Sequence, residues 1–405
     1  GAGTEENPRV LGVRPVDGED GKSLLLEASK IHQGNRLIRE QLRNLIYRDE
    51  YPIAKNITDP KNKNASIHRF QKRYEQVSLP MYQRGSWFDA GTAAGILDRF
   101  INFDTPYNYE IGPWSHGANH DANPFNDKDT PVQPSVAEQY KKIFEFLAPF
   151  VSDNSSAVKP EKKLTYFTTG SNQWKQTKVW PPKGHSMKKL WLANGGMLSQ
   201  EKPKLAKAQD SYVINYDVGS GNSSRWATQL GGGDVFYPDR AEADKLLLTY
   251  TSAPFEQSME ITGTPIVSLQ VASTHSDGAF IVYLEDVDAS GEVRMLTEGS
   301  LRAIHRKISK PEDGYKTRGP NHTFLKADAL PLVPGEISNL NFSMLPISVQ
   351  IAKGHSLRIA IAGHDKDTFI RIPDKGDPVI TVFRNALNAS FIDLPIITVK
   401  PSNSR

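Results

Sequence analysis

The chain of 405 residues contains no cysteine, which excludes disulfide bonds, thiolate nucleophiles and cysteine-ligated metal centres. It also has no excess of one charge: 49 lysines and arginines stand against 46 aspartates and glutamates, so nothing in the charge predicts a nucleic acid or anionic membrane as partner. No apolar run approaches the roughly 18 residues of a transmembrane helix. The chain as a whole is 38% hydrophobic and 9% aromatic, which is typical of a globular protein, and its length is enough for two or three domains.

Two short motifs lie close together in the first third of the chain, Gly85–Asp89 (GSWFD) and Gly112–His116 (GPWSH). Each has the pattern of a buried strand that ends on a polar side chain, and Ala90–Phe103 between them has helical spacing of apolar residues. Strand, helix and strand form the unit of a parallel sheet, whose functional side chains lie just past the carboxyl ends of its strands. Asp89 and His116 fall at these two points.

An aspartate followed by a histidine, each at a strand end, matches the order of acid and base in the Ser–Asp–His triad of α/β-hydrolases. The two motifs resemble those of the CocE/NonD hydrolases, the family of cocaine esterase, α-amino acid ester hydrolases and X-prolyl dipeptidyl peptidases. The resemblance implies that Asp89 is the triad acid and His116 the base. Two other interpretations are a helix N-cap for Asp89 and a loop position with backbone hydrogen bonds for His116.

The nucleophile motif of such enzymes, Gly-x-Ser-x-Gly, is missing. Four serines follow a Gly-x pattern without glycine two residues later, namely Ser23, Ser186, Ser223 and Ser356. Only two good parallel strands precede residue 152, whereas a parallel sheet has several strands and is covered on both faces. The first residues also contain neither methionine nor an apolar signal segment. We therefore expect the nucleophile and the oxyanion hole upstream of Gly1, in a larger enzyme of which this is the C-terminal part.

The chain divides into three predicted segments. Residues 1–75 resemble the helical cap of the family and include an amphipathic stretch at Asn35–Arg48, although an ordinary pair of surface helices fits equally well. Residues 76–152 are expected to form the C-terminal part of an α/β-hydrolase core. A segment of linker composition follows, and residues 160–405 are expected to form a jelly-roll β-sandwich.

Within the middle segment, Val77–Gln83 and Pro106–Gly112 are predicted to be the strands that lead to the two motifs. Ser135 and Glu138 have the spacing of a capping box, which predicts the start of a helix that ends at Pro149. Its apolar face carries Tyr140, Ile143, Phe144 and Leu147.

The last segment reads as β-structure throughout, because apolar and polar residues alternate in short runs separated by turn residues. Examples are Val267–Val271, Phe280–Val287, Leu340–Met344 and Leu357–Ile361. The resemblance sharpens this prediction to a jelly roll, and it rests on Thr169–Pro182, Leu248–Pro254, Gly299–Arg306 and Lys353–Ile359. Trp174, Trp180 and Trp191 are expected to serve packing, and the lysine-rich stretch from Lys159 to Lys207 is either a solvated face or a partner surface.

The sequence therefore predicts part of a serine hydrolase that cleaves ester or amide bonds in small molecules or short peptides. His116, His120 and Asp121 do not have the spacing of a metal site, and we expect neither a metal nor another cofactor. The alternative is a non-catalytic jelly-roll binding protein attached to a degenerate hydrolase remnant. The family resemblance further implies the N-terminal hydrolase segment as a partner, and homo-oligomers.

Overall fold

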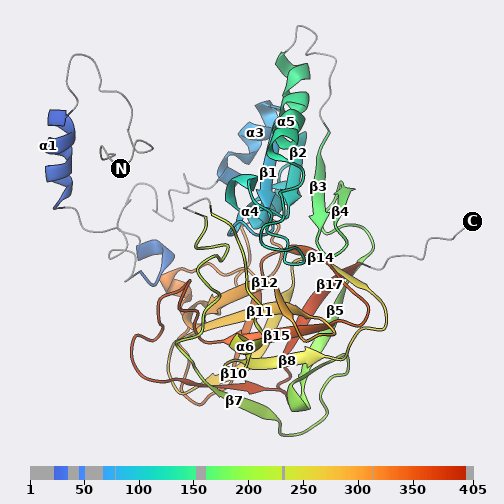
Figure 1. The fold of residues 1–405 in the computed structure, drawn as a ribbon. Helices are drawn as coiled ribbons and strands as arrows, with labels where there is room; N and C mark the ends of the chain where they lie inside the picture. Colours follow the sequence, from blue (N-terminus) through green and yellow to red (C-terminus); the bar gives the residue numbers. More distant parts are fainter. Residues whose placement is uncertain are drawn as a thin grey trace, which may run out of the picture.

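A computed structural model describes residues 22–34, 45–50, 67–77, 79–151, 161–229, 233–312 and 314–397. Most of them form two units, a small α/β unit and a larger β-sandwich that lies below it in Figure 1. The prediction of an α/β segment followed by an all-β segment is therefore confirmed. Within the described residues no helix is long and apolar enough to cross a membrane.

The α/β unit is built on a four-stranded sheet with the order β1-β2-β3-β4. β1, β2 and β3 are parallel, and β4 pairs with β3 in the antiparallel sense. β1 forms one edge of this sheet, and no strand of the described part of the chain pairs with its outer side. The strands and helices of the unit are β1 (Met81–Ser86), β2 (Tyr107–Gly112), β3 (Lys163–Thr168), β4 (Gln173–Thr177), α3 (Gln71–Val77), α4 (Thr92–Asn102) and α5 (Val136–Val151).

The first strand begins later than the sequence pattern predicts. Helix α3 extends to Val77, and β1 starts at Met81, directly after Pro80. Proline has no backbone N–H and disfavours helix in the residue before it, so Pro80 separates the helix from the strand. Helix α4 then packs on β1 and β2 through Leu97 and Phe100, which are fully buried, as its spacing predicts.

Helix α5 begins with the predicted capping box. The backbone N–H of Ser135 donates to Glu138 Oε2 at 2.8 Å, and the N–H of Glu138 donates to Ser135 Oγ at 3.3 Å. Pro149 does not end the helix, which continues to Val151. The apolar face of α5 is not covered by the described part of the chain, since Tyr140 is 59% exposed and Phe144 is 66% exposed.

The β-sandwich contains thirteen strands among the described residues and is mostly antiparallel, with β6 and β8 as a parallel pair. Its core is a continuous apolar cluster that includes Phe280, Tyr283 and Phe342. The predicted strands at Val267–Val271, Phe280–Val287, Leu340–Met344 and Leu357–Ile361 are present as β10, β11, β13 and β15. The elements of the sandwich are β5 (His185–Ala193), β6 (Met197–Ser199), β7 (Gln209–Val213), α6 (Ala241–Asp244), β8 (Leu248–Ser252), β9 (Met259–Gly263), β10 (Ile266–Ser273), β11 (Ala279–Val287), β12 (Val293–Arg302), β13 (Ser338–Ser343), β14 (Ile347–Ile351), β15 (Ser356–Ala362), β16 (Val379–Phe383) and β17 (Phe391–Ile397).

Strands β3 and β4 follow the predicted linker and nevertheless complete the first sheet. The next residues join the two units, because the N–H of Thr169 donates to Ser348 O at 3.0 Å and the N–H of Gln350 donates to Thr169 O at 2.8 Å. Figure 1 shows β3 and β4 directly above β14, which carries Ser348 and Gln350. The boundaries 1–75, 76–152 and 160–405 stay predictions, and residues 152–160 lie outside the described residues.

Most of the predicted cap region also lies outside the described residues. Within it, helix α1 spans Lys22–His32. Of the amphipathic stretch Asn35–Arg48, residues 35–44 are not described, and a short 3-10 helix, η2, follows at Arg48–Glu50.

In the lysine-rich stretch, two lysines pair with carboxylates of the sandwich. The Nζ atoms of Lys175 and Lys189 lie 2.5 Å from Glu260 Oε2 and Asp393 Oδ2. The solvated face and the partner surface both stay predictions.

Candidate active site

The two motifs lie side by side at the carboxyl edge of the first sheet. Strands β1 and β2 are parallel and in register, so that Ser86 at the end of β1 is opposite Gly112 at the end of β2. The N–H of Trp87 donates to Gly112 O at 3.0 Å and extends this pairing by one hydrogen bond. The segments that follow β1 and β2 then turn away from the sheet, and Asp89 and His116 come together beyond its edge.

The imidazole of His116 faces the carboxylate of Asp89. Its Nδ1 atom lies 3.1 Å from Oδ1 and 3.2 Å from Oδ2 of Asp89. The Asp89 side chain is 9% exposed, whereas that of His116 is 48% exposed. A carboxylate at Nδ1 fixes the tautomer with the proton on that atom, which makes Nε2 a proton acceptor. The pair therefore has one buried anionic end and one accessible basic end.

Asp89 does not cap the helix that follows it. Helix α4 has Gly91 as its N-cap, without a side-chain capping hydrogen bond, and the N–H of Thr92 donates to the backbone oxygen of Asp89 at 2.9 Å. Ala90 between them has a φ of 41°, in the left-handed region that non-glycine residues rarely adopt. This tight turn leaves the carboxylate directed toward His116.

A buried hydroxyl, that of Ser86, joins the two motifs. Ser86 Oγ accepts hydrogen bonds from the N–H groups of Phe88 at 3.0 Å and Trp114 at 2.9 Å, and it donates to the carbonyl oxygen of Trp114. One side chain thus fixes the turn after β1 and the turn after β2 relative to each other. The sequence analysis did not identify this role of Ser86. The one sequence feature that points to it is its position inside the motif, between Gly85 and Trp87.

The loop that carries His116 is held from helix α5. Gly117 and Ala118 have φ values of 80° and 57°, which make the turn after the histidine tight. Gln139 is buried and donates from Nε2 to Ala118 O at 3.1 Å and to Pro134 O at 2.8 Å, and its Oε1 accepts from Arg84. Sequence reasoning missed Gln139. A polar residue one turn before Ile143, on the same helix face, was its only signal.

A cavity of about 190 Å³ opens beside the pair. Pockets that bind drug-sized ligands have roughly 300 Å³ or more, so these residues alone do not enclose a substrate of that size. The cavity is lined by Arg84, Gly85, Ser86, Asp89, Trp114, Ser115, Gly117 and Ala118.

The other candidates from the sequence lie in different surroundings. His120 Nδ1 lies 2.5 Å from Asp234 Oδ1, in the loop before α6, and is separate from the Asp89 pair. Asp121 accepts hydrogen bonds from the N–H of Asn123 and the amide of Asn126, while burial raises its pKa. No three metal-binding side chains converge in the part of the chain that the structure describes.

None of the four Gly-x-Ser serines occupies a turn from a strand into a helix. Ser186 is within β5, Ser356 begins β15, and Ser223 lies in the loop between β7 and α6. Ser23 lies in α1. The tryptophans pack as expected: the ring centroids of Trp174 and Trp114 are 5.7 Å apart, and those of Trp180 and Trp87 are 6.2 Å apart. Trp191 packs on Phe391 at 4.7 Å.

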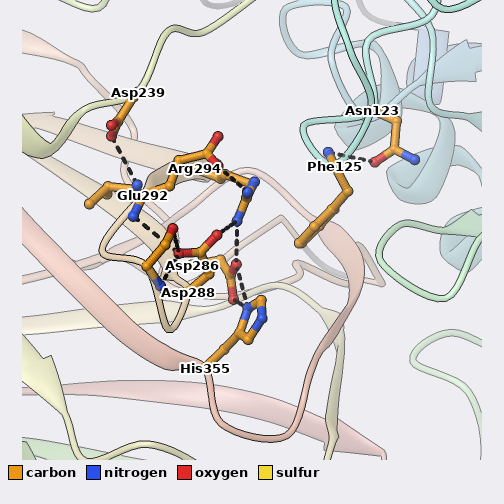
Figure 2. A network of polar contacts seen from close by, with 10 residues as sticks. Asn123, Phe125, Asp239, Asp286, Asp288, Glu292, Arg294 and His355 are labelled. Atoms are coloured by element: carbon orange, nitrogen blue, oxygen red, sulfur yellow. Dashed lines mark hydrogen bonds and ion pairs between the residues drawn. The ribbon is translucent and has the colours of Figure 1, made fainter.

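A second aspartate–histidine pair lies in the sandwich, and sequence reasoning missed it. His355 Nδ1 lies 3.0 Å from Oδ1 and 2.9 Å from Oδ2 of Asp286. Figure 2 shows this pair within a polar network, where Arg294 Nη1 lies 2.9 Å from Asp288 and 3.6 Å from Asp286. The guanidinium of Arg294 also lies over the ring of Phe125, in the loop after the His116 motif, at 6.0 Å. The partners are 69 residues apart in sequence. Asp286 lies in the predicted strand Phe280–Val287 and His355 in the family-like stretch Lys353–Ile359, but neither pattern indicates that the two side chains meet.

With this geometry in place, comparison with known proteins identifies the family. The model of the X-Pro dipeptidyl-peptidase C-terminal non-catalytic domain matches residues 156–385. The chain belongs to this family. It is a relative of the CocE/NonD hydrolases, as the motifs predicted.

Three relatives illustrate the range of the family. The chain is 36% identical over 405 residues to the protein named "Putative serine esterase Mb1866c" of Mycobacterium bovis, covering 96% of this chain and 64% of that protein. It is 24% identical to the cocaine esterase of a Rhodococcus species, covering 82% of this chain and 58% of that enzyme. The solved structure of an α-amino acid ester hydrolase matches with a TM-score of 0.59 at 18% identity, over 87% of this chain and 65% of that one. The chain thus spans less than two thirds of each of these relatives.

Proposed function

We propose that this chain supplies the acid and the base of a serine hydrolase that cleaves ester or amide bonds through an acyl-enzyme. His116 is the general base and then the general acid, and Asp89 orients its imidazole and stabilises the imidazolium. The serine and the oxyanion hole come from polypeptide N-terminal to Gly1. The observation that carries the proposal is the contact between Nδ1 of His116 and the buried carboxylate of Asp89, at the ends of two neighbouring parallel strands.

The chemistry follows from the two ends of the pair. Nε2 of His116 takes the proton of the serine hydroxyl while the serine oxygen attacks the carbonyl carbon. The tetrahedral intermediate collapses to an acyl-serine, and the leaving alcohol or amine takes the proton back from Nε2. Water repeats the two steps and releases the acid. Because the Asp89 carboxylate is largely shielded from solvent, its attraction to the transient imidazolium is screened less than at the surface.

Three features support a further segment of protein at this site. The outer side of β1 has no partner strand in the described residues, and an open edge of a parallel sheet is a place where another strand pairs. The exposed apolar face of α5, with Tyr140 and Phe144, offers a surface for that segment to cover. The cavity beside Asp89 is smaller than a ligand pocket. The match covers 64% of the mycobacterial relative and 65% of the solved α-amino acid ester hydrolase, so more than a third of each lies outside it.

The substrate belongs to the acyl-transfer class, as an ester or amide of a small molecule, an amino acid or an X-Pro peptide. Two arguments support this class: the names of the relatives, and the proposed mechanism, which requires a substrate carbonyl near Nε2 of His116. The proposed reaction requires no metal or organic cofactor. We also propose self-association into dimers or larger assemblies, as the family resemblance implies.

The rival proposal is a non-catalytic binding protein. Two observations favour it: the matched domain is described as non-catalytic, and the chain has no Gly-x-Ser-x-Gly motif. The two proposals differ in one respect that an experiment can reach, namely whether a serine beside His116 is activated.

Labelling with a serine-directed fluorophosphonate tests this difference. We expect the chain alone to remain unlabelled and the protein with its N-terminal hydrolase segment to be labelled. Asp89→Asn in that longer protein should abolish turnover while thermal unfolding stays near that of the parent, because Asn keeps the size of the side chain but not the charge. Labelling of the isolated chain would refute an external serine, and near-parental turnover of Asp89→Asn would refute the triad.

A further inference from the structure

The β-sandwich contacts the turn that carries Asp89 through a buried cation. Arg225 lies in the loop between β7 and α6 and is 1% exposed. Its Nη1 donates to the carbonyl oxygen of Trp87 at 2.6 Å, and its guanidinium carbon lies 5.3 Å from the ring centroid of Phe88. Trp87 and Phe88 are the two residues directly before Asp89. The contact crosses from one unit of the protein to the other.

The cation is held in place by the sandwich itself. Arg225 Nε lies 3.4 Å from Oε1 of Glu298 on β12, and the same oxygen accepts from Nε1 of Trp226 at 2.7 Å. The hydroxyl oxygen of Tyr237 accepts from the backbone N–H of Arg225 at 3.0 Å. Burial lowers the pKa of Arg225, but Glu298 and Tyr237 raise it more, so its pKa lies above the ordinary value and the side chain stays charged. A charged, multiply bonded guanidinium is a rigid support.

Trp87 is fixed by three hydrogen bonds in different directions. Its N–H donates to Gly112 O at 3.0 Å, and its indole Nε1 donates to Phe167 O at 2.7 Å. The bond from Arg225 holds its carbonyl oxygen, and therefore the plane of the peptide that leads into Phe88 and Asp89. Without Arg225 this buried carbonyl loses its charged donor, and the direction of the turn is no longer set on that side.

We infer that Arg225 is a positioning residue of the reaction, which keeps the turn after β1 in the orientation that directs Asp89 toward His116. This inference rests on the proposed function. It assigns the sandwich a part in arranging the active site, although the domain that it matches is described as non-catalytic. Among the described residues Arg225 forms no hydrogen bond or ion pair with Asp89 or His116, and it acts through the Trp87–Phe88 backbone.

The test is a double variant with a matched control, in the protein that carries its N-terminal segment. Arg225→Met with Glu298→Gln removes the cation, leaves no unpaired carboxylate and keeps the side-chain volumes close. Arg240→Met with Glu285→Gln makes the same change at a second buried pair, whose Nε–Oε1 distance is 2.6 Å and whose side chains are 2% and 0% exposed. That pair lies within the sandwich and forms no hydrogen bond or ion pair with either motif among the described residues. Asp244, which lies 3.8 Å from Arg240 Nε, keeps its ion pair with Arg358 at 2.9 Å, so the control leaves no unpaired carboxylate either.

Two measurements decide the outcome. We expect kcat of the Arg225/Glu298 variant to fall by about 10- to 100-fold against the control variant, with KM within about twofold, because small misplacements of a catalytic group have effects of this size. We also expect the downfield NMR signal of the Nδ1 proton of His116, assigned by its loss in His116→Gln, to weaken in that variant and to persist in the control. Both results together support the inference, and the absence of either overturns it.

A folding defect does not leave the inference untested. If the double variant fails to fold, Arg225→Lys takes its place under the same criteria, since lysine keeps the charge opposite Glu298 but lacks the guanidinium fork. Failure of the proposed function gives a different pattern, in which Asp89→Asn and His116→Ala keep parental turnover. The NMR signal reports on the contact between Asp89 and His116 whether or not the protein is an enzyme.

Discussion

The α/β unit and the sandwich each contain an aspartate–histidine pair with nearly the same contact. In both, the carboxylate lies about 3 Å from Nδ1 of the imidazole, at 3.1 Å for Asp89 and His116 and 2.9 Å for Asp286 and His355. The surroundings differ. The His116 side chain is 48% exposed beside a cavity, whereas that of His355 is 22% exposed and its aspartate is completely buried next to Arg294.

The contrast shows that a hydrogen bond alone does not define a catalytic base. Asp286 pairs with both His355 and Arg294. Arg294 also pairs with Asp288 and Glu292. Each of these charges already has a partner in the network of Figure 2. Among the residues that the structure describes, no arginine forms an ion pair with Asp89, and its histidine lies at the carboxyl ends of parallel strands, where such sheets place their functional side chains.

The largest predicted effect is on turnover. In the protein with its N-terminal segment, His116→Ala should lower kcat by about 10⁴- to 10⁶-fold, as the loss of a triad member does. His355→Ala, the same change in the other pair, should leave kcat within about threefold of the parent, because that pair joins two antiparallel strands of the sandwich and does not lie at the carboxyl ends of parallel strands. Steady-state kinetics on both variants measures the difference. Equal losses in the two would show that the comparison is wrong.

For the free energy of unfolding we expect the opposite order, with the larger loss at the aspartate of the sandwich, Asp286, and the smaller at Asp89. Asp286→Ala should lower the free energy of unfolding by about 2–4 kcal/mol, because a buried carboxylate with two charged or polar partners is removed and they lose their acceptor. Asp89→Ala should cost less than about 1 kcal/mol, since its partner is half exposed and becomes hydrated. Urea unfolding of the chain measures both values. A larger loss for Asp89 would mean that its contact mainly supports the fold.

The sequence predicted Asp89 and His116 because each ends a contiguous motif, and because strand ends of one parallel sheet must meet. It also predicted α4, the capping box of α5 and the alternating strands, which depend on local spacing alone. Arg225 could not be found in this way, since it contacts Trp87 across 138 residues from a loop without periodicity.

The Asp286–His355 pair was missed because its residues are 69 positions apart and meet only through the pairing of β11 with β15. What covers the apolar face of α5 could not be predicted either. The spacing of Tyr140 and Phe144 correctly places them on one helix face, but spacing cannot tell what covers that face, and the described chain leaves it exposed. The triad roles themselves stay proposals, which the turnover of the His116 variant tests.

The smallest predicted effect concerns the buried network and its pH dependence. Burial raises the pKa of Asp286 above its ordinary value of about 4, an effect larger than the opposing ones of His355 and Arg294. The native state therefore binds this proton more tightly than the unfolded state. The contribution of Asp286 to stability is fully present below pH 4 and is lost as the pH rises through its native pKa. The difference in unfolding free energy between the parent and Asp286→Asn should thus decrease from pH 3 to pH 6.

Asp288 provides a control of opposite sign in the same network. Hydrogen bonds from Ser290 and the contact with Arg294 hold its pKa below the ordinary value, so its contribution is present above pH 4 and is lost as the pH falls. The difference between the parent and Asp288→Asn should therefore increase from pH 3 to pH 6, and urea unfolding across that range measures both. Parallel slopes for the two variants would show that Arg294 and His355 outweigh burial at Asp286. The Asp286–His355 pair would then behave as an ordinary ion pair, and its burial would no longer distinguish it from the Asp89–His116 pair.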